Sequence, residues 1–104
     1  MGKNNLLSAN NLNPTFNSNL PNVAWPEDTS TYFNISGNFS DLNNDTLTYG
    51  VLSLVENITI TINSTTGIVN LTPSPNFNGI RYAMFFANDS QNITYSNNVT
   101  INVT

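Results

Sequence analysis

The chain has 104 residues, of which 38% are hydrophobic and only 8% are charged, and its formal net charge is -4. Its only basic residues, Lys3 and Arg81, cannot form the cluster that nucleic acids or anionic membranes require. It contains neither Cys nor His, which excludes disulfides, thiolate or imidazole zinc sites and the commonest acid–base and nucleophilic catalysts.

Residues 1–19 are rich in Asn with scattered Leu, and we expect them to form a flexible leader or an inter-repeat linker. No run of about 18 apolar residues occurs, so no membrane-spanning helix is predicted. From Leu20 onward the pattern changes to short runs of β-branched and aromatic residues separated by Gly, Pro, Asn and Asp. We therefore assign residues 20–104 to a single domain.

Seven strand-like runs follow one another within this domain. The clearest is residues 58–62, where three Ile alternate strictly with Thr and so share one face of a strand. No segment has a 3.6-residue period over helical length. The predicted strands are residues 21–25, 31–36, 46–54, 57–63, 67–72, 80–88 and 93–104.

Seven short strands with turns every 8–12 residues predict an all-β fold, an immunoglobulin- or cadherin-like β-sandwich, with a closed barrel as the alternative. The alternation also predicts which side chains face the core, with Trp25 covering one edge. The inward set is Phe33, Ile35, Phe39, Leu47, Tyr49, Ile58, Ile60, Ile62, Val69, Leu71, Phe85, Ala87, Val99, Ile101 and Val103.

Six fragments, in this order and spacing, carry a resemblance to a known family. They are the linker-like residues 10–16, the Glu-bearing residues 26–29, the acidic loop with Leu-Thr-Tyr at 41–49, Thr-Gly-Ile-Val at 66–69, and residues 75–79 and 87–90. Together they resemble the cadherin-like tandem repeats of prokaryotic, in particular archaeal, cell-surface proteins. The resemblance covers nearly the whole chain and implies an extracellular location.

The resemblance further implies weakly bound calcium at the junction of successive repeats. The ligands it implies are Glu27, Asp41, Asn43, Asp89, Asn11 and Asn13, with Asn10 beside them. Amide oxygens can coordinate calcium but neutralise no charge, so Asn at linker positions predicts low affinity. The alternative is that Asp41, Asn43 and Asp45 only satisfy backbone groups in an Asx-type turn.

Ten Asn residues begin an Asn-x-Ser/Thr sequon, whereas the composition predicts about 5 by chance. Several fall on the predicted outward phase of strands, which favours N-glycosylation; the alternative is simply a polar surface in an Asn-rich chain. The sequons begin at Asn34, Asn38, Asn44, Asn57, Asn63, Asn70, Asn88, Asn92, Asn98 and Asn102.

The leading functional hypothesis is a non-enzymatic structural or adhesion module, one repeat of a cell-surface stalk whose partners are neighbouring repeats or identical subunits. The first alternative is a filament subunit that polymerises when residues 1–19 add a strand to a neighbour's sheet. The second is a carbohydrate-binding module that uses Trp25, Tyr32, Tyr82 or Tyr95. Catalysis is not expected, because Glu27 and Asp28 are adjacent and point to opposite faces of a strand.

Overall fold

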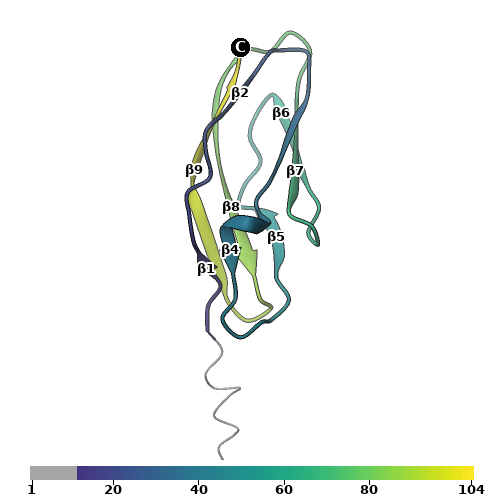
Figure 1. The fold of residues 1–104 in the computed structure, drawn as a ribbon. Helices are drawn as coiled ribbons and strands as arrows, with labels where there is room; N and C mark the ends of the chain where they lie inside the picture. The colour runs from purple at the N-terminus through teal and green to yellow at the C-terminus, as the bar shows by residue number, and fades with distance from the viewer. Residues whose placement is uncertain (1–11) are drawn as a thin grey trace, which may run out of the picture.

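The computed structural model describes residues 12–104, and this part of the chain consists of β-strands joined by turns (Figure 1). Residues 12–104 contain no helix that could span a membrane. The elements are β1 (Thr15–Phe16), β2 (Val23–Trp25), β3 (Thr31–Asn34), the 3-10 turn η1 (Ser36–Asn38), β4 (Phe39–Ser40), β5 (Thr48–Val51), β6 (Ile58–Ile62), β7 (Ile68–Pro73), β8 (Gly79–Asn88) and β9 (Ile93–Val103).

The strands form two main sheets that enclose the core. One sheet has the order β2-β9-β8-β5 and the other has the order β3-β7-β6, while β1 and β4 pair at one side. All the pairs are antiparallel except β2 with β9, which is parallel. The predicted all-β, immunoglobulin-like sandwich is confirmed.

The predicted strands correspond to β2, β3 and β5 to β9, with ends that differ by a few residues. The largest difference is β5, which ends at Val51 because Leu52 and Leu54 leave the sheet and are exposed. Strands β1 and β4 were not predicted, because two residues are too few to show an alternation.

Strand β1 changes the expected domain boundary. Thr15 and Phe16 pair with Ser40 and Phe39, and the rings of Phe16 and Phe39 lie 5.1 Å apart. The latter part of the segment that we expected to be a leader therefore belongs to the folded domain. Residues 1–11 lie outside the described residues.

The entering segment, residues 12–22, runs along β9 and is held to that strand mainly by side chains. The amide group of Asn97 accepts a hydrogen bond from Leu20 N at 2.8 Å and donates one to Leu20 O at 3.0 Å. Thr94 Oγ1 donates to Pro14 O at 2.6 Å, and Asn22 Oδ1 accepts from Thr100 N at 3.2 Å. Side chains thus replace part of the backbone ladder that would otherwise join two strands.

The core lies between the two main sheets, and the predicted phase is confirmed because no residue placed inside is exposed. Trp25 is also buried, and its Nε1 donates to Thr29 O at 2.7 Å. Phe85 is fully buried and meets Phe33 edge-to-face at 5.6 Å. Leu20 and Ala83 are buried as well, although the alternation did not single them out.

Candidate functional site

Three carboxylates meet at one end of the sandwich. Asp41 directly follows β4, Asp45 lies in the same loop, and Asp89 directly follows β8. Each offers an oxygen, and these oxygens all lie within 4.8 Å of one another. The loops that carry them lie together at the lower end of Figure 1.

Two of these carboxylates also shape their own turns. Asp41 Oδ1 accepts a hydrogen bond from Asn43 N at 2.7 Å, and Asp89 Oδ1 accepts from Gln91 N and Asn92 N at 2.9 and 2.7 Å. Carboxylates that accept backbone N–H groups in this way are held in a fixed direction. The Asx-type turn expected at Asp41 is therefore present, and it leaves the second carboxylate oxygen of Asp41 for another partner.

That second oxygen, Asp41 Oδ2, is buried and has no hydrogen-bond partner among residues 12–104. A buried carboxylate oxygen without a partner is costly, because it has lost its water and gained nothing in exchange. Three convergent carboxylates with one orphaned oxygen suit a hard cation such as calcium. The residues present therefore fit the ion that the resemblance implies.

The entering chain lies beside this cluster. Leu12 N donates a hydrogen bond to Asn43 Oδ1 at 2.8 Å, so Asn43 ties residue 12 to the β4–β5 loop. Asn13 is exposed in the same segment. Asn10 and Asn11, two further residues implied by the resemblance, lie outside the described residues.

Glu27 lies far from the other implied ligands. Its Oε1 accepts a hydrogen bond from Asn78 Nδ2 at 3.1 Å, and Asn78 immediately precedes β8, whereas Asp89 immediately follows it. The ten residues of β8 span about 33 Å at the usual rise per residue. One ion cannot bind both ends, so Asp45 takes the place beside Asp41 and Asp89 that the resemblance gave to Glu27.

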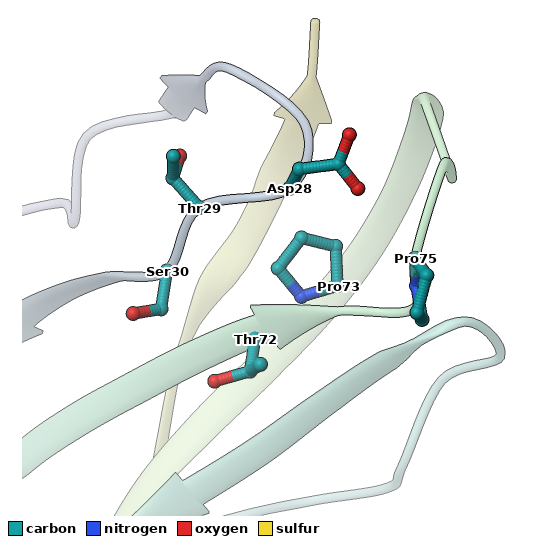
Figure 2. Close-up of a pocket in the computed structure, with 6 residues that line it drawn as sticks. All are labelled: Asp28, Thr29, Ser30, Thr72, Pro73 and Pro75. Carbon is teal, nitrogen blue, oxygen red and sulfur yellow. The ribbon is translucent and has the colours of Figure 1, made fainter.

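The Glu27 end carries a small depression of about 290 Å³, shown in Figure 2. Its lining residues are Asp28, Thr29, Ser30, Thr72, Pro73 and Pro75. Asp28 is the only ionisable residue among these six, and its Oδ1 accepts a hydrogen bond from Asn76 N at 2.8 Å. The depression therefore offers no pair of titratable groups for acid–base chemistry.

All ten sequon Asn residues lie at the surface to some degree. Six are exposed and four are half-buried. Asn38 Nδ2, the atom that would carry a sugar, donates to Ser18 O at 3.0 Å and Ser18 Oγ at 3.1 Å, so Asn38 is the least accessible chemically. The exposed residues are Asn34, Asn44, Asn57, Asn63, Asn70 and Asn98, and the half-buried ones are Asn38, Asn88, Asn92 and Asn102.

The four aromatic residues predicted as candidates for sugar binding differ in exposure. Trp25 is buried, so its assignment to a sugar platform was wrong. Tyr32, Tyr82 and Tyr95 are 73%, 56% and 45% exposed. Tyr32 lies on β3, in the sheet opposite to the one that contains Tyr82 and Tyr95, so the three rings do not form one platform.

The sequence profile of the bacterial Ig domain family matches residues 10–102, and the chain therefore belongs to this family. No protein of curated function matches the chain by sequence. The family match supports the immunoglobulin-like part of the resemblance described above. The cadherin-like, tandem-repeat and archaeal parts of that resemblance remain predictions.

Among solved structures, an alpha-galactosidase candidate from Bacteroides fragilis is similar over 88% of this chain, with 18% identity and a TM-score of 0.63. The endo-fucoidan hydrolase MfFcnA9 of glycoside hydrolase family 107 is similar over 88%, with 22% identity and a TM-score of 0.57. MfFcnA4 of the same family is similar over 91%, with 21% identity and a TM-score of 0.59. The chain covers only 17%, 16% and 14% of those three chains, so the similarity shows the fold alone.

Proposed function

We propose that this bacterial Ig domain is a non-enzymatic structural module of an extracellular protein, a stiff unit that joins its neighbours end to end in a cell-surface stalk. The observation that carries the proposal is the path of the chain. Residue 12 lies beside Asn43, at the end of the sandwich that carries the three carboxylates. Thr104 lies at the other end, where its N donates to Trp25 O at 2.8 Å (Figure 1).

The distance between the two ends suits a spacer. Strand β9 begins next to the loop of Asp89 and ends beside β2, and its 11 residues span about 36 Å. Domains attached before and after this one would therefore be held apart by the length of the sandwich. A sandwich with a continuous core bends little over that length.

We further propose that Asp41, Asp45 and Asp89 bind calcium at the end where the chain enters. The bond from Leu12 to Asn43 puts any preceding domain close to these carboxylates. A divalent ion would neutralise their mutual repulsion and fix the entering segment against the loop. The ion would thereby stiffen the junction rather than perform chemistry.

Thermal unfolding in 5 mM calcium and in chelator tests the calcium proposal. Extracellular calcium sites bind at about 0.1–1 mM, so 5 mM calcium should raise the Tm by about 5–11 °C. The variant Asp45→Asn is the sharpest probe, because Asp45 is exposed and its side chain caps no turn in the described structure. In chelator it should raise the Tm slightly by removing one of three like charges, whereas in calcium it should lower it.

Glu56→Gln is the matched control, because Glu56 is an exposed carboxylate outside the cluster. It should leave the calcium-dependent rise in Tm unchanged. An equal rise in the wild type and in Asp45→Asn would show that calcium does not bind at this cluster. No rise in either protein would leave a spacer without calcium.

N-glycosylation of the surface sequons is a further part of the proposal, supported by the absence of fully buried Asn among the ten. Sugars would supply the solubility that the few charged residues do not. Peptide mass spectrometry of the protein from its native host tests it directly. Unmodified Asn at all ten positions would refute it.

The filament alternative has one specific observation in its favour. The entering segment is held to β9 partly through Asn97, Thr94 and Asn22 rather than through a full backbone ladder. Such a segment can leave its own sheet more easily than a laddered strand and join the sheet of another copy. Electron micrographs that show only monomer-sized particles would exclude this alternative.

A further inference from the structure

The outward face of the β2-β9-β8-β5 sheet has an unusual surface. Strand β8 presents Ile80, Tyr82, Met84 and Phe86 outward, because the intervening Ala83, Phe85 and Ala87 are buried. Ile80 and Tyr82 are 48% and 56% exposed. No outward position on β5, β8 or β9 carries a charged side chain. An exposed apolar face of this kind usually has an occupant.

The strand register places two sequons around Tyr82. Tyr82 pairs with Thr100, and its diagonal neighbours on β9 are Asn98 and Asn102, which pair with Met84 and Ile80. Side chains that are diagonal on one face of an antiparallel pair lie about 7–8 Å apart, within reach of an aromatic ring. Both Asn side chains therefore project beside the exposed ring of Tyr82.

The two amides are free to be modified. Within residues 12–104, the side chains of Asn98 and Asn102 make no hydrogen bond, whereas that of Asn97, in the same strand, holds Leu20. Thr100, the hydroxyl residue of the Asn98 sequon, lies on the same outward face. The sequons and the strand register therefore both place an attached sugar on the outward face, beside Tyr82.

The same arrangement occurs on the other sheet. Tyr32, the most exposed of the tyrosines described above, pairs directly with Asn70 on β7, and Asn70 also begins a sequon with no side-chain hydrogen bond in the described structure. Tyr32 and Tyr82 come from different strands, yet each has a sequon Asn as a cross-strand neighbour. This recurrence argues for sugar as the occupant of both surfaces.

We propose that Tyr82 is a packing platform for N-linked sugars on Asn98 and Asn102, and that Tyr32 serves Asn70 in the same way. The apolar C–H face of the first sugar residues packs on the tyrosine ring, while the sugar hydroxyls face water. The chain's own sugars thus cover surfaces that no charged residue protects. This inference depends on the N-glycosylation proposed above and adds a specific role for the tyrosines.

The test begins with the chain secreted from yeast cells, which attach N-linked sugars to sequons. Peptide mass spectrometry first establishes whether Asn98 and Asn102 are occupied. The Tm is then compared before and after enzymatic removal of the sugars, in the wild type and in Tyr82→Ser. We expect a loss of about 3–6 °C in the wild type, the scale of one aromatic packing contact in a domain of this size, and less than half of that loss in Tyr82→Ser.

A matched control keeps the result specific to the ring. Thr46→Ala abolishes the sequon of Asn44, a loop residue, and should leave the wild-type loss of Tm unchanged. The unglycosylated proteins made in bacteria give a second control, because Tyr82→Ser should change their Tm little at an exposed position. In the glycosylated protein, the protons of the first sugar residues should show ring-current shifts that disappear in Tyr82→Ser.

The outcomes separate the inference from the proposal on which it depends. If Asn98 or Asn102 carries sugar but the loss of Tm is the same in the wild type and in Tyr82→Ser, the proposed role of Tyr82 is wrong and the proposed glycosylation is supported. No sugar at any of the ten sequons in secreted protein overturns both. If the unglycosylated chain forms concentration-dependent dimers that Tyr82→Ser abolishes, the face binds a second copy of the chain. If the NMR signals of Tyr82 shift when free oligosaccharide is added, the face binds a sugar ligand. Either result overturns the inference.

Discussion

Gly50 offers a sharp test of how the outer face is packed. Gly50 lies on β5 opposite Phe86, and a Cβ built on Gly50 would lie 2.3 Å from Phe86 Cζ and 2.8 Å from Cε2. No real Cβ atom approaches another carbon so closely, so Gly50→Ala must push the ring aside. The displaced ring would also leave its edge-to-face contact with Tyr95, whose centroid is 6.2 Å away.

The magnitude follows from two opposing effects. Displacing a packed ring costs about 1–3 kcal/mol, and the lost aromatic pair adds about 0.5–1.5 kcal/mol. Replacing Gly by Ala within a strand gains about 0.5–1 kcal/mol, because the unfolded chain loses conformational freedom. Gly50→Ala should therefore lower the free energy of unfolding by about 0.5–4 kcal/mol.

Urea denaturation of a double-mutant cycle with Phe86→Ala measures this effect. Without the ring, nothing obstructs the added methyl group, and Gly50→Ala should stabilise the Phe86→Ala protein by about 0.5–1 kcal/mol. Gly50→Ala should thus destabilise the wild type and stabilise the Phe86→Ala protein. A stabilising Gly50→Ala in the wild type, or the same destabilisation in both backgrounds, would refute the packing of Phe86 over Gly50.

Three further predictions concern other parts of the fold. Asn97→Ala should lower the free energy of unfolding by about 1–3 kcal/mol in urea titrations, because both backbone groups of Leu20 lose their partner, whereas Asn98→Ala in unglycosylated protein should change it by less than about 0.5 kcal/mol. Gly67→Ala should lower the free energy of unfolding by about 1–2 kcal/mol or more, because Gly67 has a φ of 79° and its added Cβ would lie 3.0 Å from Ser36 N. Gly37→Ala, whose added Cβ would have no atom within 4 Å, should leave the free energy of unfolding nearly unchanged. Burial raises the pKa of Tyr49 above its ordinary value of 10.0, so its contribution to stability is complete below pH 10 and is lost as the pH rises through the folded-state pKa. Unfolding free energies measured between pH 8 and 11.5 should fall less steeply in Tyr49→Phe, and parallel pH profiles would show that Tyr49 is not responsible.

The strands and the core could be predicted because both depend on local alternation. The run at residues 58–62 shows this directly, since Ile58 and Ile60 are buried, Ile62 is half-buried, and the two alternating Thr residues are exposed. Leu20 lies outside any alternating run, and its burial depends on the clamp of Asn97, 77 residues later in the chain. A contact of that kind has no local signal.

The acidic cluster could be predicted only in part. The resemblance implies Asp41 and Asp89 as ligands, and the structure brings these two carboxylates together. The resemblance implies Glu27 as well, but Glu27 lies beyond the opposite end of β8. The length of β8 separates the end of the sandwich near Glu27 from the end near Asp89. The short sequence fragments that carry the resemblance do not show on which end of the sandwich each fragment lies.

If the domain is a stiff unit joined end to end, two successive copies should lie along one axis. Small-angle X-ray scattering of two copies fused in tandem, Thr104 of the first joined to Met1 of the second, tests it most directly. We expect an extended particle whose maximum dimension exceeds about 70 Å, because each sandwich spans about 36 Å along β9. Its distance distribution should be narrower in 5 mM calcium than in chelator. A compact particle with the two domains side by side, whether or not calcium is present, would contradict it.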